Sequence, residues 1–240
     1  MQILLSGGAG FIGSHLVDAL LKKVNKVHVV DNLSTGKLEN LNLSATFYKM
    51  DICDPGLGEL VCSIRPEIVY HLAAQLSVPR SIHNPYEDTR VNILGTVNLL
   101  EACVKAGVKR IVFSSSAAVY GLPQYLPINE AHPLNTISPY GASKAAAEEY
   151  IRLYQRMYGM NYVILRYANV YGPRQDAEGE GGVVSIFSSR LASREALTIF
   201  GSGEQTRDFV YVKDTVRANL AAATCSPNYT INVGTGEATS

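Results

Sequence analysis

Short apolar runs and longer amphipathic stretches follow one another along the chain. The apolar runs, rich in Val, Ile and Leu, predict strands at Ile3–Ser6, Lys26–Val30, Ala45–Lys49, Ile68–His71, Arg110–Ser114 and Tyr162–Leu165. The stretches between them favour helices, most clearly at Pro55–Ile64, Tyr86–Ala106 and Pro139–Tyr158. Because the strands show little polar alternation, we expect a parallel sheet buried on both faces, in an α/β doubly wound fold.

The pattern changes after Tyr171. Gly172-Pro173 and the polar stretch Gln175–Gly182 predict a loop into a second region. For that region we predict helices at Val184–Arg194 and Val212–Ala223 and strands at Leu197–Phe200 and Tyr229–Val233. We therefore divide the chain into residues 1–172, a Rossmann domain that carries the chemistry, and residues 173–240, a smaller region. Since the last strand runs into an open loop, we expect this region to be incomplete at its C-terminal side.

Three glycines, at positions 7, 10 and 13, lie between the first strand and the first helix. Such a turn lets a pyrophosphate approach the backbone and directs helical N–H groups at it. Asp31 ends the second strand, where a carboxylate binds the adenosine ribose hydroxyls. A turn-capping role for Asp31 is compatible with that one. Since Lys37 is the only basic residue just beyond Asp31, the sequence favours NAD over NADP.

The composition of the 240-residue chain narrows the choice of partners. Lys plus Arg and Asp plus Glu are balanced at 21 each, so no basic surface for nucleic acid or an anionic membrane is expected. No apolar run approaches the length of a membrane span. The four cysteines are scattered without metal-ligand spacing, which favours a reduced cytoplasmic protein without a metal site.

Tyr140 and Lys144 are four residues apart on a predicted helix, so both project from one face. Ser138 and Pro139 are a good N-cap and first residue, which places Tyr140 in the first turn. There the helix dipole and the ammonium group favour a phenolate, so we expect a lowered pKa and a general base for a hydroxyl substrate. The alternative is a packed ring beside a solvated lysine.

Three serines, Ser114-Ser115-Ser116, end the strand that precedes this helix. In a doubly wound sheet, ligands bind at the carboxyl ends of the strands. A serine there can hydrogen-bond both a substrate hydroxyl and the tyrosine oxygen. At least one or two of the three are expected only to cap or turn the chain.

Together these patterns resemble the extended short-chain dehydrogenase/reductase family, most closely its sugar-nucleotide epimerases of the UDP-glucose 4-epimerase type. The resemblance covers essentially the whole chain. It rests on eight motifs: Gly-Gly-Ala-Gly-Phe-Ile-Gly (7–13), Asp-Asn-Leu-Ser-Thr-Gly (31–36), Asp51-Ile52, His-Leu-Ala-Ala-Gln (71–75), Ser-Ser-Ser-Ala-Ala-Val-Tyr-Gly (114–121), Tyr140-Gly-Ala-Ser-Lys144, Leu165-Arg-Tyr-Ala-Asn-Val-Tyr-Gly-Pro-Arg174 and Arg207-Asp-Phe-Val-Tyr-Val212.

The resemblance implies roles for particular residues. Ser116, Tyr140 and Lys144 would be catalytic. NAD would be bound by Gly7, Gly10, Phe11, Ile12, Gly13, Asp31, Asn32, Thr35, Gly36, Asp51, Ile52, Leu72, Ala73, Ala74, Asn92, Ser114, Tyr140, Lys144, Tyr167 and Val170. A UDP-sugar would be bound by Ser77, Ser116, Tyr140, Asn169, Val184, Phe200 and Arg207, with Arg207 on the diphosphate.

Residues 117 and 118 separate the reactions within this family. Relatives that eliminate water carry Asp-Glu here, and decarboxylating relatives place a Glu here. This chain has Ala117-Ala118, which transfer no proton. What remains needs only one base and a hydride acceptor, which fits the epimerisation at C4 that the resemblance implies, through a 4-keto intermediate with Tyr140 as base and NAD as transient hydride acceptor.

Three points stay open at this level. The alternatives to the epimerase are an NAD(P)H-dependent reductase of a 4-keto nucleotide sugar and a catalytically silent NAD-binding module. The glucose, N-acetylglucosamine and glucuronate versions of the UDP-sugar are not separated. In this family, helices such as 86–106 and 139–158 pair across a two-fold axis, so the resemblance implies a homodimer built as a four-helix bundle.

Overall fold

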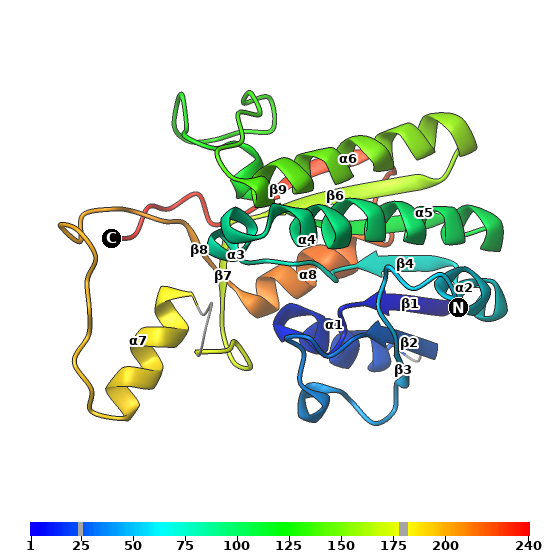
Figure 1. Cartoon of the computed structure of the whole chain (residues 1–240), viewed down its shortest axis with the longest axis horizontal. Coiled ribbons are helices and arrows are strands. Elements are labelled where there is room, and N and C mark those ends of the chain that lie inside the picture. Colours follow the sequence, from blue (N-terminus) through cyan, green and yellow to red (C-terminus); the bar gives the residue numbers. More distant parts are fainter. Residues whose placement is uncertain (24–25, 178–181) are drawn as a thin grey trace.

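A seven-stranded parallel sheet forms the centre of the computed structural model, which describes residues 1–23, 26–177 and 182–240 (Figure 1). The strand order is β3-β2-β1-β4-β5-β6-β9. In chain order these strands are β1 (Gln2–Ser6), β2 (Lys26–Asp31), β3 (Thr46–Lys49), β4 (Ile68–His71), β5 (Arg110–Ser116), β6 (Asn161–Tyr167) and β9 (Tyr229–Val233). The predicted doubly wound α/β fold is confirmed, with the order of connection reversing between β1 and β4.

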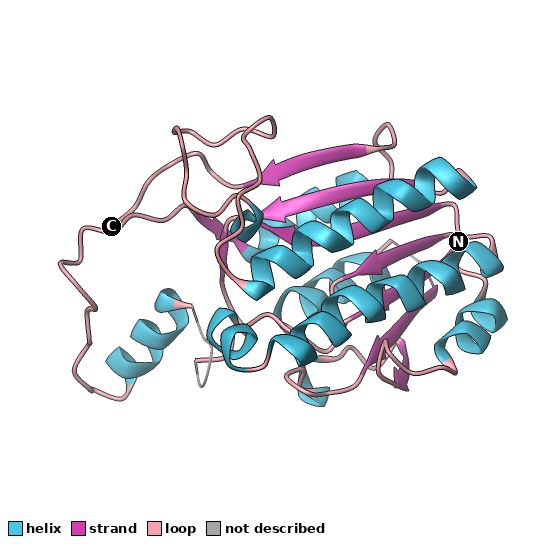
Figure 2. Ribbon diagram, turned by 45° about the horizontal axis from the view of Figure 1, so that its top comes forward, coloured by secondary structure: helices cyan, strands magenta, loops and turns pink. Residues whose placement is uncertain are grey.

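Helices cover both faces of the sheet, as Figure 2 shows. Leu4 of β1 belongs to the core under α2 (Leu57–Ile64), α5 (Gly95–Ala106) and α6 (Pro139–Tyr158). Its neighbours Ile3 and Leu5 belong to the opposite core, under α1 (Phe11–Leu21) and α8 (Val212–Ala222). Since successive strand side chains point to opposite faces, a strand covered on both sides must be apolar throughout, which explains the continuous apolar runs.

The predicted helix at 86–106 is a chain of shorter elements. It consists of α4 (Pro85–Thr89), one π-helical turn (Arg90–Leu94) and α5. The side chain of Asn84 caps its start by accepting from the Glu87 N–H, and α3 (Val78–His83) precedes it. Two short 3₁₀ turns lie elsewhere in the fold: Leu38–Asn40 between β2 and β3, and Ala117–Val119 after β5.

The region after residue 172 differs from its prediction in two places. The predicted strand at Leu197–Phe200 is wrong: the segment follows α7 (Val183–Ala192) without pairing, and Phe200 is 82% exposed. An apolar run forms a strand only where a sheet edge can receive it. Instead, β7 (Asn169–Tyr171) pairs with β8 (Phe209–Tyr211) in a parallel ribbon that the sequence analysis missed. The loop predicted at Gln175–Gly182 lies partly outside the described residues.

The last elements return to the main sheet. Helix α8 packs on α1, and β9 pairs with β6 at the sheet edge. Residues after 211 thus complete the sheet that residues before 172 begin. Helix α7 and the chain after it project away from the sheet (Figure 1). None of the described helices is long and apolar enough to cross a membrane.

Candidate active site

A cleft of about 560 Å³ opens at the carboxyl ends of β1, β2, β4, β5 and β6, a size typical of a small-molecule site. Most residues predicted from the sequence to bind ligands line it. Those predicted for the cofactor are Gly7, Gly10, Phe11, Ile12, Gly13, Asp31, Asn32, Thr35, Gly36, Asp51, Ile52, Leu72, Ala73, Ala74, Ser114, Tyr140, Lys144, Tyr167 and Val170. Those predicted for the substrate are Ser116, Tyr140, Asn169, Val184 and Arg207.

Three predicted ligand contacts do not line this cleft. Asn92 is buried, and its amide donates to Asp88 and Ser143 and exchanges hydrogen bonds with the backbone of Gln75. Ser77 caps α3 by accepting from the Arg80 N–H at 3.0 Å. Phe200 lies on the exposed segment after α7.

The glycine turn is shaped by close packing. A Cβ at Gly13 would lie 2.1 Å from the Gly7 carbonyl oxygen, and one at Gly7 would lie 2.6 Å from the Ala73 nitrogen. Gly7 also has φ +78°, in the region that favours glycine. The tight turn lets α1 begin at Phe11, and the first N–H groups of a helix have no partner within it. The residues of this first turn line the cleft, where the positive end of the helix dipole favours an anion.

Asp31 is buried at the end of β2 and already holds the loop. One carboxylate oxygen accepts from the Ala9 N–H at 2.9 Å, and the other accepts from the Leu33 N–H at 2.8 Å. The turn-capping role is therefore present. Because each carboxylate oxygen accepts more than one hydrogen bond, the ribose role stays compatible with it.

A close approach of two elements brings Tyr140 to the end of β5. A Cβ at Gly141 would lie 2.6 Å from the Ala118 carbonyl oxygen, so only glycine lets α6 start against the turn that follows Ser116. Ser138 caps α6 as predicted, accepting from the Gly141 N–H at 3.1 Å. The Ser116 hydroxyl acts on the Tyr140 side chain in the direction that lowers the pKa of Tyr140. Gly141 is thus a positioning residue that helical spacing alone did not indicate.

The expected lowering of the Tyr140 pKa is wrong. Burial disfavours the phenolate and raises the pKa of Tyr140, and the hydrogen bond with Ser116 only partly opposes that effect. The Lys144 ammonium is directed elsewhere, because its Nζ donates to the Ser114 carbonyl oxygen at 2.9 Å.

Lys144 is buried rather than solvated. It is 4% exposed, and its Nζ lies 4.8 Å from the centroid of the Phe113 ring. Burial lowers the pKa of Lys144 to about 8, against the opposing influence of Asp88 and Glu148. The alternative of a solvated lysine beside a packed ring is excluded by this geometry. Strongly shifted groups of this kind, gathered in a cleft, are typical of active sites.

The three serines have three different partners. The Ser114 hydroxyl lies 2.9 Å from the Tyr167 hydroxyl, and Ser115 donates to Glu148 at 2.6 Å. Ser116 faces Tyr140 and also accepts from the Ala118 N–H at 3.2 Å. Ser115 is therefore tied to the buried Glu148, Ser116 caps the turn near Tyr140, and Ser114 is linked to Tyr167 in the wall of the cleft.

Sequence analysis missed a buried ion pair directly behind this site. Arg166 on β6 donates to both oxygens of Glu148 on α6, at 2.9 and 2.6 Å. Arg152 adds a further hydrogen bond at 2.7 Å. Glu148 lies one turn beyond Lys144, and Ser115 lies between Ser114 and Ser116, so the pair joins α6, β5 and β6 where they carry the catalytic candidates. A Glu four residues after Lys144 was the only sequence signal.

The far end of the cleft is formed by the β7–β8 ribbon. Asn169 is held there by the Asp208 carbonyl oxygen, which accepts from its backbone N–H at 2.9 Å. The Asp208 carboxylate accepts hydrogen bonds from the backbone N–H groups of Thr235 and Gly236. Arg207 forms no ion pair with any described residue, so its charge remains available to an anion. The described residues contain no cluster of His, Cys, Asp or Glu suited to a metal ion.

The chain matches the family model described as "NAD dependent epimerase/dehydratase family" over residues 3–234. It is 45% identical to a UDP-glucose 4-epimerase from Mycolicibacterium smegmatis, with all of this chain and 79% of that protein covered. Two solved structures are similar over all of this chain. One, from Thermotoga maritima with UDP-glucose, has a TM-score of 0.98 at 50% identity and 78% coverage of its own chain. The other, a Thermus thermophilus UDP-glucose 4-epimerase complexed with NAD, has a TM-score of 0.94 at 44% identity and 79% coverage.

Proposed function

We propose that this chain, which belongs to the NAD dependent epimerase/dehydratase family, is an NAD-dependent 4-epimerase of a UDP-sugar of the glucose/galactose type. One observation carries the proposal. The cleft joins a glycine-turn anion site, a ribose-binding carboxylate and the trio Ser116, Tyr140 and Lys144. Next to the trio, Ala117 and Ala118 provide no acid or base for an elimination.

The residues that line the cleft support binding of the cofactor along its length. The N-terminus of α1 faces the position of a pyrophosphate, and Asp31 can accept from the adenosine ribose. We assign Lys144, which lines the cleft with Tyr140, to the hydroxyls of the nicotinamide ribose. When bound, NAD supplies the hydride acceptor for C4 of the sugar.

The protein groups handle the proton. We assign Tyr140 as the base for the sugar 4-hydroxyl, with the Ser116 hydroxyl as the proton relay between the two oxygens. The pKa of Lys144 is about 8, so the side chain is charged below that pH. When the ammonium group also donates to ligand hydroxyls, its charge stabilises the Tyr140 phenolate. Arg207, Asn169 and Val184, from the segment 173–211 and its ribbon, are assigned to the nucleotide-sugar end, where Arg207 pairs with the diphosphate.

Turnover of UDP-galactose to UDP-glucose tests the proposal. We expect the purified chain to convert one into the other with catalytic rather than stoichiometric NAD. Stoichiometric consumption of NADH or NADPH with a 4-keto nucleotide sugar would favour the reductase alternative. Binding of NAD with no turnover of UDP-glucose, UDP-N-acetylglucosamine or UDP-glucuronate would contradict the proposal and favour the silent binding module.

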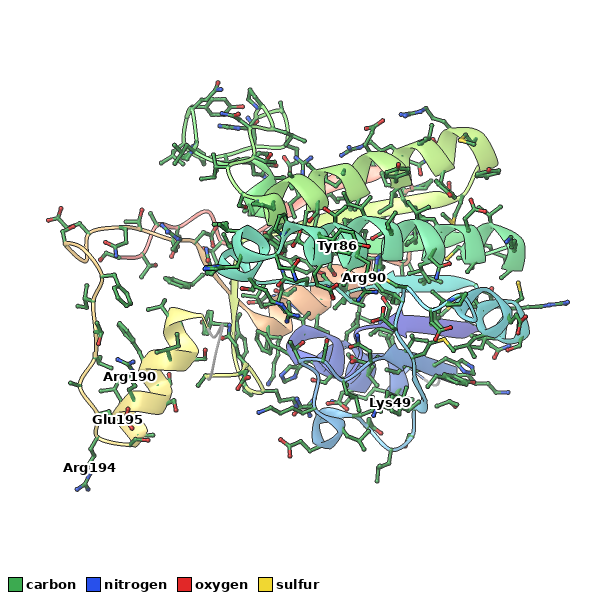
Figure 3. The ribbon with its side chains drawn as sticks, viewed as in Figure 1. Lys49, Tyr86, Arg90, Arg190, Arg194 and Glu195 are labelled. Carbon is green, nitrogen blue, oxygen red and sulfur yellow. The ribbon has the colours of Figure 1, made fainter. Side chains whose placement is uncertain are left out.

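We also propose a homodimer. Apolar side chains stand exposed on the outer faces of the paired helices, including Leu94 at 58% and Met157 at 56%. Figure 3 shows Tyr86 and Arg90 on the helical segment that leads into α5, next to α6. Two such helices from each copy would bury these side chains in a four-helix bundle.

Light scattering at working concentration should give twice the mass of the chain. Replacing Met157 by Arg should shift the mass toward the monomer, while Leu122→Arg, on the loop before α6, should leave it unchanged. A monomeric wild-type protein would rule the dimer out.

The cysteines agree with a reducing compartment, and we propose the cytoplasm. All four cysteines are free thiols, and burial raises the pKa of Cys53 to about 11.

A further inference from the structure

A buried hydrogen-bond chain leads from α8 to the wall of the cleft. Asn219 is fully buried on α8 and is not a residue of the cleft. Its Nδ2 lies 2.8 Å from the Thr215 carbonyl oxygen and 2.7 Å from the Tyr167 hydroxyl. The Tyr167 hydroxyl in turn lies 2.9 Å from Ser114 Oγ. Both Tyr167 and Ser114 line the cleft.

The donor and the acceptor of each hydrogen bond in this series follow from its buried end, at Asn219 and Thr215. A carbonyl oxygen only accepts, so the amide atom facing Thr215 must be the nitrogen, and it donates. The same nitrogen faces the Tyr167 hydroxyl, which therefore accepts from Asn219. Among the described residues, Ser114 is then the remaining hydrogen-bonding partner for the single proton of Tyr167. Ser114 Oγ accepts that proton and keeps its own proton to donate.

Ser114 belongs to the end of the cleft that carries the catalytic candidates. Ser114 lines the cleft together with Lys144 and Tyr140, and its backbone carbonyl oxygen accepts from Lys144 at 2.9 Å. Asp31 and the glycine turn belong to other strands, β2 and β1. A dinucleotide that lies with its pyrophosphate on α1 extends its nicotinamide riboside toward β5. The oxygens of that half, on the carboxamide and on the ribose, are all hydrogen-bond acceptors.

We propose that Asn219 is a positioning residue: through Tyr167 it fixes Ser114 as a hydrogen-bond donor to an oxygen of the nicotinamide riboside. The inference rests on the proposed use of NAD and adds a residue outside the cleft to its binding. Without the amide of Asn219, the Tyr167 hydroxyl can accept from Ser114 instead, and the donor toward the ligand is lost. A neutral hydrogen bond of this kind contributes a factor of about 3 to 10 in affinity.

Calorimetric titration with AMP, ADP-ribose and NAD tests the inference. Asn219→Leu and Ser114→Ala should each weaken NAD binding about 3- to 10-fold and leave AMP binding unchanged. The double variant should lose no more than either single variant, because both remove the same hydrogen bond. ADP-ribose distinguishes the acceptor: if it loses the same factor, the acceptor is a ribose oxygen, and if it loses nothing, the acceptor is the carboxamide.

Two further variants separate this role from a structural one. Thr215→Val lies one turn before Asn219, is equally buried and keeps the backbone carbonyl, so it should bind NAD like the wild type. Asn219 reaches Ser114 only through the Tyr167 hydroxyl, so in a Tyr167→Phe background Asn219→Leu should cause no further loss of NAD affinity.

Unchanged NAD affinity in folded Asn219→Leu, equal losses for AMP and NAD, or additive losses in the double variant would overturn the inference. NAD binding that responds as described in a protein without epimerase turnover would refute only the proposed sugar chemistry.

Discussion

Tyr140→Phe should lower the epimerase turnover by a factor of about 10² to 10⁴, the usual contribution of a general base. The substitution removes only the phenolic oxygen, and the ring keeps its place at the start of α6. Because Tyr140 is one of many residues that line the cleft, the affinity for NAD should remain within a few fold of the wild type. Initial rates with UDP-galactose and calorimetric titration with NAD measure the two quantities.

Tyr150→Phe is the matched control for this substitution. It lies on the same helix, is 39% exposed and does not line the cleft, so its turnover should equal that of the wild type. A Tyr140→Phe enzyme that keeps more than a tenth of the wild-type rate would contradict the role of Tyr140 as base.

Arg166→Met should destabilise the fold by about 3–5 kcal/mol, the usual effect of removing one partner from a buried ion pair. Glu148 is fully buried and Arg166 is 4% exposed. Burial acts against the ionised carboxyl, but the hydrogen bonds from Arg166 and Ser115 outweigh it, and the pKa of Glu148 is lowered. Without Arg166, the carboxylate keeps only Ser115 and the partly exposed Arg152. Urea unfolding followed by circular dichroism measures the loss.

Two controls and a pH series sharpen this measurement. Arg217→Met breaks an exposed ion pair with Asp214 on α8 and should change stability by no more than about 1 kcal/mol. The double variant Glu148→Met/Arg166→Met should recover part of the loss, because no unpaired buried charge remains.

A carboxyl whose folded-state pKa is lowered contributes stability above its unfolded pKa, near 4.3, and loses that contribution as the pH falls through the folded value. The difference between wild type and Arg166→Met should therefore shrink in acid. An unchanged unfolding midpoint for Arg166→Met at neutral pH would contradict a stabilising role for the pair.

The sequence by itself determined the features that depend on short stretches of chain. The strands of the main sheet follow from apolar runs, because both faces of a covered sheet need apolar side chains. The glycine turn follows from the glycine spacing and the strand–helix context. The common helical face of Tyr140 and Lys144 follows from a separation of four residues. These local rules place Asp31 and Ser116 at the carboxyl ends of strands and Tyr140 and Lys144 in the first turns of a helix, where the structure has them.

The tertiary structure alone decided what depends on residues far apart in the chain. The Leu197–Phe200 segment stays unpaired because no sheet edge receives it, whereas three-residue β7 and β8 pair because they meet in space. Burial and the direction of Lys144 toward Ser114 reverse the expected shift of the Tyr140 pKa. The pairing of Glu148 with Arg166 and that of Asn219 with Tyr167 join helices to strands through hydrogen bonds that no sequence period encodes. Desolvation and partner geometry, which set charge and proton direction in the site, exist only once the layers are packed.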